Sequence, residues 1–365
     1  MLNIRDFDYI LLVPVGLLII LGLVTLYSLS PVSGDLFLKK QILWTVLGIV
    51  VMFFTSSIDY RLFRSRGAIV FIFYAISVGA LALIFVAGTR IKGVEGWFSF
   101  GGFLLQPVEF VKIALLIIFA KYFSGRHIEI YHWKHVFISG AYIAIPAFLL
   151  MLQPDLGSTI VIIGLWIAIM IFAGISWKRI FILAVLFGII SIGAWYGVLA
   201  SYQKARMTSF LNPWADSRGS GYQVIQSMIA VGGGKITGAG IGYGTQSHLH
   251  FLPEPETDFI FATFAEEWGF IGNVLFFSIF GFFFWRLWFL ARAASNNFAI
   301  FFILGYSVLI FIQFTIHVGA NTGVLPITGL TLPFMSYGGS SLLALFLGLG
   351  IIQSIATRQN ATFEN

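Results

Sequence analysis

Apolar runs long enough to cross a lipid bilayer recur along the whole chain, and they constrain its fold more than any other feature. Hydrophobic residues make up 59% of the 365 residues, and charged residues only 10%. A hydrocarbon core of about 30 Å takes roughly 20 helical residues to cross. Because unpaired backbone groups are costly in lipid, segments that cross it form helices or closed barrels. The chain is therefore predicted to be an all-α polytopic membrane protein.

The apolar runs predict about ten transmembrane helices, so both termini are expected on the same side. The runs lie near residues 9–30, 41–57, 67–88, 105–123, 136–153, 157–174, 180–200, 259–285 with a break, 298–318 and 339–356. We expect residues 1–365 to form a single membrane domain.

Lys and Arg in the short loops predict the orientation, because cytoplasmic loops are enriched in them. The short loops on one side carry only Lys39, Lys40, Arg90 and Lys92. The other side carries Arg5, Arg61, Arg64, Arg66, Lys121, Arg126, Lys134, Lys178, Arg179, Arg286, Arg292 and Arg358. This second side is predicted to be cytoplasmic, together with both termini.

Net charge and cysteine content exclude several function classes. The formal net charge of +6 reflects the cytoplasmic clusters and indicates contact with anionic lipid, not with nucleic acid. The chain has no cysteine, which excludes disulfides, thiolate catalysis, and cysteine-ligated zinc or iron–sulfur clusters.

A long, polar, glycine-rich loop at residues 201–258 is predicted to face outward and to end at Asp258. Loops of this length are usually functional or disordered. Aromatic and apolar residues are spaced through this loop, which argues against disorder. Its glycines between 232 and 244 resemble a phosphate loop weakly, since no strand precedes them, but amides freed by glycine can hold a lipid pyrophosphate.

Polar residues at membrane depth need pairing, water or a function to offset their cost. Glu109 and Lys112 share a helix face and can pair, after Pro107 in the first turn. Two interpretations stay open: a structural ion pair, and the charged lining of a cavity that opens outward. Asp155, in a tight turn at residues 153–157, either caps the next helix or belongs to a site. The uncharged segment 329–341 is predicted to be partly re-entrant and packed on protein.

Five motifs follow one another along the chain: QPVEFVK at 106–112, QPDLGS at 153–158, GTQSHLHFLPE at 244–254, TDFIFA at 257–262 followed by AEEWG at 265–269, and LPFMSYGGSS at 332–341. In this order on about ten spans, they resemble the SEDS family of peptidoglycan glycosyltransferases, and within it the elongation-associated RodA branch. The resemblance covers nearly the whole chain.

The resemblance implies polymerisation of lipid II, an undecaprenyl-pyrophosphate-linked disaccharide pentapeptide, into β-1,4-linked glycan outside the cytoplasmic membrane. The family's essential loop aspartate falls on Asp258, which would act as the general base on the acceptor hydroxyl in an inverting transfer. Undecaprenyl pyrophosphate would leave. Glu256 is the alternative base, whereas Glu266 and Glu267 are expected to pair or cap within the membrane.

The resemblance also implies substrate-binding positions, ligands and partners. The positions are Glu109, Lys112, Gln153, Asp155, Arg206, Gln246, Ser247, Ser336 and Ser340. Lys112 and Arg206 are the candidates for phosphate contacts. No ligand motif specifies a metal, although a divalent cation, Mg²⁺ or Mn²⁺, suits carboxylates beside a pyrophosphate. The expected partners are a class B penicillin-binding protein with a single membrane anchor and other proteins of the elongation complex.

Two other functions are compatible with a chain of this kind. A lipid II flippase or other transporter would also carry paired intramembrane charges, but it would need them at several depths. The predicted spans are nearly free of charge towards the cytoplasm. A non-catalytic cell-wall scaffold would leave Asp258 replaceable by Asn.

Overall fold

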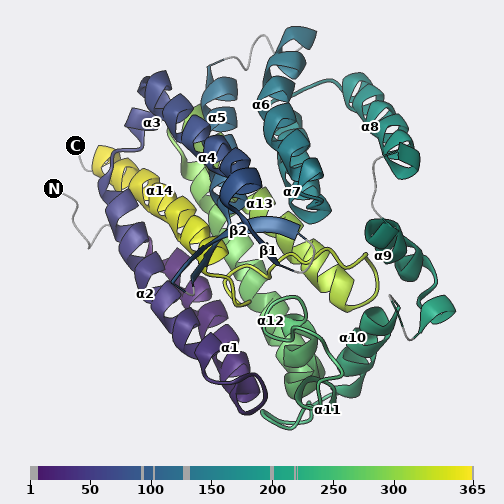
Figure 1. The fold of residues 1–365 in the computed structure, drawn as a ribbon. Helices are drawn as coiled ribbons and strands as arrows, with labels where there is room; N and C mark the ends of the chain where they lie inside the picture. Colours follow the sequence, from purple (N-terminus) through teal and green to yellow (C-terminus); the bar gives the residue numbers. More distant parts are fainter. Residues whose placement is uncertain are drawn as a thin grey trace.

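The computed structural model describes residues 7–363 except 92–93, 102, 126–131, 198–200, 218 and 220. Within this part of the chain the protein is a bundle of long helices with a short sheet (Figure 1), so the predicted all-α membrane fold is confirmed. The first described residues lie beside the last long helix, where the Asp8 amide donates to Gln353 Oε1 at 2.8 Å.

Each predicted span overlaps one helix of 17 residues or more. These are α1 (Tyr9–Ser33), α2 (Leu36–Ser57), α4 (Gly67–Ala87), α5 (Pro107–Ser124), α6 (Trp133–Leu152), α7 (Leu156–Phe172), α8 (Trp177–Gly197), α12 (Ile260–Ala293), α13 (Asn297–Asn321) and α14 (Gly339–Phe363). Eight helices of the described residues are long and apolar enough to cross a membrane. Of the other two, α7 has 17 residues and α5 carries Glu109, Lys112 and Lys121, so the count of ten spans stays a prediction.

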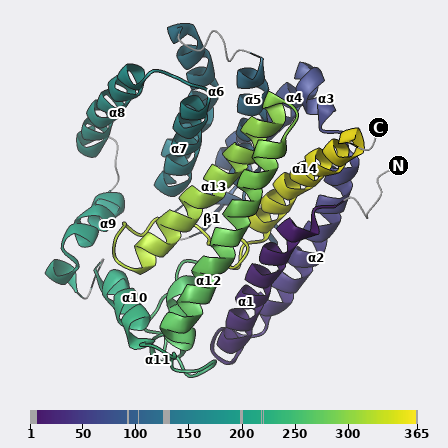
Figure 2. The ribbon, with the colours of Figure 1, turned by 180° about the vertical axis from the view of Figure 1, so that it is seen from behind.

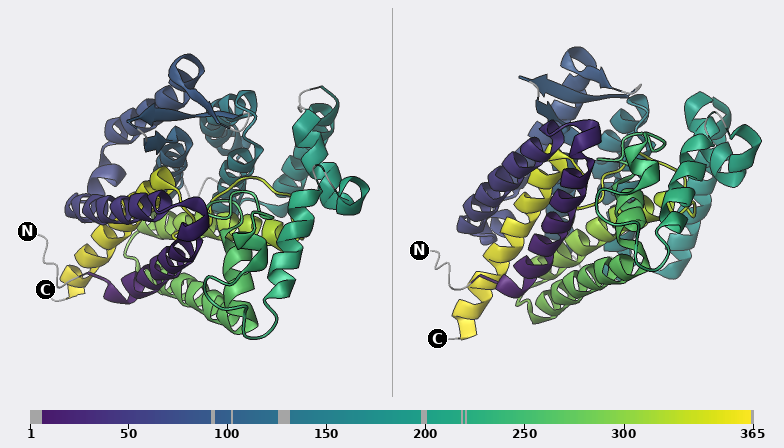
Figure 3. Two further views of the ribbon diagram at one scale, coloured as in Figure 1. Left: turned by 60° about the horizontal axis from the view of Figure 1, so that its bottom comes forward. Right: turned by 90° about the horizontal axis from the view of Figure 1, so that it is seen from below.

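The centre and the edge of the bundle differ sharply in burial. In α14, 89% of the span is buried against protein, and it packs on α2 and α5. In α8 only 6% is buried. Seen from behind, α12 and α13 run side by side while α8 stands at the edge (Figure 2), and the views from below place α8 at the edge as well (Figure 3). The candidate active site lies on the buried side of the bundle.

The predicted outer loop is folded. It contains the helices α9 (Ser201–Leu211), η2 (Pro213–Asp216), α10 (Tyr222–Gly233) and α11 (Thr245–His248). On the opposite side of the bundle, α3 (Arg61–Ser65) connects α2 to α4.

An antiparallel sheet that the sequence analysis did not predict joins α4 to α5. Its strands are β1 (Thr89–Ile91), β2 (Val94–Phe100) and β3 (Phe103–Leu105), in the order β1-β2-β3. The span predicted from residue 105 consequently begins two residues later. Pro107 occupies the first turn of α5 as predicted, where its missing N–H costs no hydrogen bond.

The helix assigned as α12 consists of two segments that fold back on each other at Gly269. Gly269 is non-helical, with φ +63° and ψ −162°. The Phe261 and Phe276 rings lie 5.4 Å apart, and the Phe264 and Phe276 rings 5.7 Å. In one straight helix, residues fifteen apart would be separated by about 22 Å along the axis. Residues 260–268 are therefore a re-entrant half-helix packed against the following segment.

The predicted break in this span is confirmed, but its position changes the interpretation of the span. Because the chain reverses direction at Gly269, only residues 270–293 continue in one direction, and the span is now predicted there and not at 259–285. Nine residues of half-helix measure about 13 Å. Asp258 precedes the half-helix and therefore lies about this distance from the elbow at Gly269, inside the bundle.

Residues 234–240, called here the glycine segment, supply hydrogen bonds on both sides of the elbow. The Ala239 and Gly240 amides donate to the Glu266 and Glu267 carbonyls at 2.9 and 3.0 Å. The Phe270 and Ile271 amides donate to the Lys235 and Ile236 carbonyls at 2.9 and 3.1 Å. A break in a helix frees groups of this kind, and leaving them unpaired would be costly.

Residues 322–338, between α13 and α14, form a second irregular segment inside the bundle. Leu332, Phe334 and Met335 are at most 2% exposed. A Cβ on Gly22 would meet the Met335 carbonyl oxygen at 2.5 Å. Gly22 lies eleven residues, or about 16 Å, before the end of α1. The prediction that residues 329–341 pack on protein is confirmed for these buried side chains, and the re-entry into the membrane stays a prediction.

The elbow predicts that Gly269→Ala destabilises the protein by at least about 3 kcal/mol. An added Cβ would lie 2.2 Å from the Gly238 amide nitrogen and 2.7 Å from the Gly234 carbonyl oxygen, at a positive φ. The matched control is Gly281→Ala in the same helix, where nothing lies within 4 Å. Thermal unfolding and size-exclusion profiles in detergent measure both variants. A Gly269→Ala protein that behaves like the control would contradict the elbow.

Candidate active site

Asp258 lies in a turn at the inner end of the half-helix. The Thr257 and Asp258 amides both donate to the Glu254 carbonyl at 3.2 Å. The Asp258 carbonyl accepts a hydrogen bond from Asn321 Nδ2 at 2.9 Å. The residue is half-buried. Its backbone is therefore fixed from two sides, by its own turn and by the end of α13.

Ser336 joins the second re-entrant segment to the turn that carries Asp258. Its hydroxyl donates to the Thr257 carbonyl at 2.8 Å and accepts from the Leu332 amide at 2.9 Å. The neighbouring Tyr337 amide donates to the Glu256 carbonyl at 2.9 Å. The structure thus places Ser336 beside Asp258, with its hydroxyl engaged in holding two segments together.

Gln41 of α2 holds the second re-entrant segment from the other side. Its Nε2 donates to the Ser336 carbonyl at 3.1 Å, and its Oε1 accepts from the Gly338 amide at 3.4 Å. Gln41 is 1% exposed. The sequence analysis did not single it out, although a glutamine within an apolar span is a signal by itself.

Gly329 lies against the Asp258 carboxylate. A Cβ built on Gly329 would be 3.7 Å from Asp258 Oδ2, and its φ of +75° favours glycine. The preceding residue, Thr328, lines a cleft together with Asp155 and Arg206. The carboxylate and the cleft therefore neighbour consecutive residues of one backbone segment.

The cleft brings together two of the predicted site residues, Asp155 and Arg206. Asp155 Oδ1 accepts from the Ser158 amide at 2.9 Å, so the side chain caps α7 and also borders the cleft. Gln203 Nε2 donates to the Pro154 carbonyl at 3.1 Å, which ties α9 to the turn before α7. The guanidinium at this cleft suits a phosphate-bearing ligand, whereas the carboxylate suits a hydroxyl or a bound cation.

Glu109 and Lys112 form the predicted ion pair, with 2.8 Å between Nζ and Oε1. They are 6% and 1% exposed. Ser340 links the start of α14 to the start of this helix, since its Oγ accepts from the Gln106 amide at 2.8 Å and donates to the Leu104 carbonyl at 3.1 Å. The burial of Glu109 and Lys112 supports the interpretation as a structural ion pair. Ser340 binds the strand and the turn that precede α5.

Gln153 lies away from these contacts. Its Nε2 donates to the Leu81 carbonyl at 2.9 Å, and the side chain is 2% exposed. It connects the end of α6 to α4. This geometry supports a packing role more than substrate contact.

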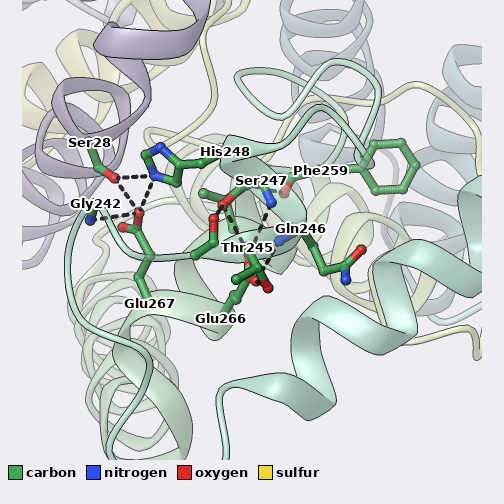
Figure 4. A network of polar contacts seen from close by, with 11 residues as sticks. Ser28, Gly242, Thr245, Gln246, Ser247, His248, Phe259, Glu266 and Glu267 are labelled. Atoms are coloured by element: carbon green, nitrogen blue, oxygen red, sulfur yellow. Dashed lines mark hydrogen bonds and ion pairs between the residues drawn. The ribbon is translucent and has the colours of Figure 1, made fainter.

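Glu266 caps the predicted loop motif at Gln246 and Ser247 (Figure 4). Its Oε1 accepts from the Gln246 amide at 2.7 Å and from Thr245 Oγ1 at 3.3 Å. Its Oε2 accepts from the Ser247 amide at 3.2 Å and from Ser247 Oγ at 3.0 Å. Ser247 is fully buried. The geometry gives this serine a supporting role, and the expected cap by Glu266 is present.

Glu267 connects α1 to the same loop (Figure 4). Its Oε1 accepts from Ser28 Oγ and from the Gly242 amide, the latter at 3.1 Å, and lies 3.2 Å from His248 Nε2. Ser28 Oγ also lies 3.2 Å from His248 Nε2. The two neighbouring carboxylates of the half-helix therefore fix the loop 242–248, as the expectation of pairing or capping required.

The glycine-rich stretch does not present a free set of amides to a phosphate. The amides of Gly238, Ala239 and Gly240 are bound to backbone carbonyls, and the Gly242 amide is bound to Glu267. The physical reason is the elbow, whose broken helix ends need these partners. The suggestion that this stretch holds a pyrophosphate is wrong for these four amides.

The comparisons with known proteins agree with this architecture. The family model described as "Cell cycle protein", FtsW/RodA/SpoVE, matches residues 8–361. The stage V sporulation protein E of Bacillus subtilis is 36% identical over 96% of both chains. The peptidoglycan glycosyltransferase MrdB of Escherichia coli K12 is 33% identical over 96% of this chain and 95% of its own.

Two solved structures match over nearly the full length. A chain from "Structural coordination of polymerization and crosslinking by a peptidoglycan synthase complex" has a TM-score of 0.81 and 32% identity, covering 97% of this chain and 98% of its own. The RodA protein of Thermus thermophilus has a TM-score of 0.71 and 28% identity, covering 96% of each chain.

The helical fold of this chain is therefore similar to that of both solved structures over nearly its full length. The chain belongs to the FtsW/RodA/SpoVE family, that is, to the SEDS proteins. The RodA branch stays a prediction, since relatives with three different names match at similar identity, among them a probable FtsW of Trichlorobacter lovleyi at 36%.

We predict that Glu266→Gln exposes the loop 242–249 to protease. The substitution replaces one of two acceptor oxygens that together bind four donors, so at least one buried donor loses its partner. Chymotrypsin cleavage at the exposed residues Tyr243 and Leu249 should accelerate about fivefold or more, because local opening governs such cleavage. Ser278→Ala, which removes an exposed hydrogen bond within α12, is the control. Equal cleavage rates would show that Glu266 does not hold the loop.

The ion pair gives a second prediction. Lys112→Met alone leaves the buried Glu109 carboxylate unpaired and should cost about 3–5 kcal/mol. The double variant Glu109→Gln/Lys112→Met removes both charges and should recover most of that loss. Thermal midpoints of the two variants and the wild type measure the difference. A double variant as unstable as the single one would rule out the structural interpretation of the pair.

Proposed function

We propose that the protein is a peptidoglycan glycosyltransferase that polymerises lipid II at the outer face of the bacterial cytoplasmic membrane, with both termini in the cytoplasm. Family membership over residues 8–361 and relatives named peptidoglycan glycosyltransferases support the activity. The bias of Lys and Arg among the short loops supports the orientation. The motif GTQSHLHFLPE supports the RodA branch.

The position of Asp258 is the observation that carries this proposal. Its carboxylate lies beside Gly329 of the second re-entrant segment, and the preceding residue, Thr328, lines the cleft that Asp155 and Arg206 share. The residue is half-buried, so a substrate can reach it. A base for a membrane-bound substrate needs this combination of a fixed backbone and an accessible carboxylate.

Asp258 acts as the general base in the proposed reaction. It takes the proton from the 4-hydroxyl of the acceptor sugar while that oxygen attacks the anomeric carbon of the donor. The bond from this carbon to the pyrophosphate oxygen breaks, and undecaprenyl pyrophosphate leaves with the electron pair. Attack from the opposite face converts the α-linked donor into a β-1,4 product. Pyrophosphate is a good leaving group, so one carboxylate suffices for the transfer.

Arg206 is the proposed contact for the pyrophosphate, because it borders the cleft that adjoins Thr328. Lys112 comes second, since it is buried against Glu109. In the described residues, no group of three His, Asp or Glu side chains could hold a metal ion. A divalent cation would therefore need ligands from the substrate phosphates and water in addition to Asp258 or Asp155.

The proposed partner is a class B penicillin-binding protein, with further elongation-complex proteins around it. The support is the matching chain from a peptidoglycan synthase complex that coordinates polymerization and crosslinking. A flippase is less well supported. It needs a polar path through both leaflets, whereas α5 between Lys112 and Lys121 is apolar and buried.

Asp258→Asn should lower the rate of lipid II polymerisation by about 10² to 10⁴, the range expected for loss of a general base. The assay uses the purified protein with its penicillin-binding partner and lipid II. Glu256→Gln is the matched control, because Glu256 lies two residues away and is 5% exposed. We expect it to stay within about threefold of the wild type.

Three other outcomes contradict the assignment in different ways. Loss of activity in Glu256→Gln alone would move the base to Glu256. Equal polymer from wild type and both variants would remove the base from this turn. Full support of growth by Asp258→Asn, without any polymer from the wild type, would favour the scaffold.

A further inference from the structure

Asn321 stands at the last position of α13 and is fully buried. Its Nδ2 donates to the Asp258 carbonyl at 2.9 Å and to the His317 carbonyl at 2.9 Å. Its Oδ1 accepts from the Ala262 amide at 3.0 Å. Two carbonyls require the NH₂ group and one amide requires the oxygen, so these partners fix the orientation of the side-chain amide.

These contacts bracket the start of the half-helix. Ala262 is the third residue of α12, and the first amides of a helix have no partner within it. Phe259, directly before the helix, offers no capping side chain. Asn321 therefore caps the half-helix from a different helix, and the same side chain binds the residue proposed as the base.

The end of α13 is itself held in place. Ser227 Oγ of α10 donates to the Asn321 carbonyl at 2.7 Å. One turn earlier, His317 Nδ1 binds the Leu330 carbonyl at 2.7 Å, which anchors the second re-entrant segment. The last turn of α13 thus binds both the start of the half-helix and the second re-entrant segment.

We propose that Asn321 is a positioning residue for the base: it holds the Asp258 backbone against α13 and so sets where the carboxylate meets the acceptor hydroxyl. This inference rests on the proposed function of Asp258. Small displacements of a reacting group lower the rate strongly, by about 10² for 1 Å. The effect falls on the chemical step, because Asn321 is buried and does not touch the substrate cleft.

The test compares Asn321→Leu and Asn321→Asp with Ser227→Ala in lipid II polymerisation with the partner present. Leu preserves the volume and removes all three hydrogen bonds. An ionised Asp keeps an acceptor for the Ala262 amide but loses both donors. Ser227→Ala removes a buried hydrogen bond to the same residue without touching Asp258 or Ala262. If Asn321→Leu does not fold, Asn321→Asp carries the test.

Both Asn321 variants should lower kcat about 10- to 100-fold and leave KM within about threefold, whereas Ser227→Ala stays near the wild type. Hydrogen exchange in the peptide covering 258–265 should accelerate in Asn321→Leu and not in Ser227→Ala, since the Ala262 amide loses its acceptor. This second readout does not depend on activity.

The inference is overturned by wild-type kcat in both Asn321 variants, by an equal loss in Ser227→Ala, or by a rise in KM in place of the fall in kcat. Unchanged exchange over 258–265 overturns it as well. Failure of the proposed function shows separately, as full activity of Asp258→Asn with the exchange effect of Asn321→Leu still present.

Discussion

The hydrogen bonds between the glycine segment and the elbow at Gly269 are the interaction on which the rest of the site depends. Four backbone bonds replace those that the broken helix gives up. Without these bonds, residues 260–268 would have to continue as a straight helix into residues 270–293. Otherwise four backbone groups would stay unpaired where little water reaches them. The fold-back sends Asp258 inward and keeps Glu266 and Glu267 beside the outer loop. One reversal of the chain thus separates Asp258, the proposed base, from the two carboxylates that hold the loop 242–248.

The remaining backbone groups of the irregular segments are bound by side chains from the long helices. Gln41 of α2 binds the second re-entrant segment, and Asn321 of α13 binds the start of the half-helix. Each uses both the NH₂ group and the oxygen of its side-chain amide. Ser336 then binds one segment to the other. Irregular backbone is tolerated at membrane depth when protein groups satisfy it in this way. The same amides that make the fold possible also determine the geometry of the site.

Periodicity and local chemistry predicted a large part of this structure. The long helices, a break within the span 259–285, Pro107 in a first turn, the pair Glu109 and Lys112 and the cap that was one of two alternatives for Asp155 all depend on residues close in sequence. The reversal at Gly269 was missed, because the apolar pattern is similar on both sides of the glycine. Asn321 was missed because its partners lie 59 and 63 residues away. The sheet at 89–105 was missed because its strands are short and stand between two spans.

The groups that hold the half-helix and the second re-entrant segment come from both directions along the chain, and this has a consequence for how the protein is made. Gln41 and the glycine segment precede Asp258, whereas Asn321 and Ser336 follow it. Synthesis proceeds from the N-terminus, at about 5–20 residues per second. During translation, the inner end of the half-helix is therefore not bound until Asn321 has been made, 63 residues after Asp258. A nascent chain can have most of its helices in the membrane and still lack an ordered site, so the last two helices complete the enzyme as much as they complete the bundle.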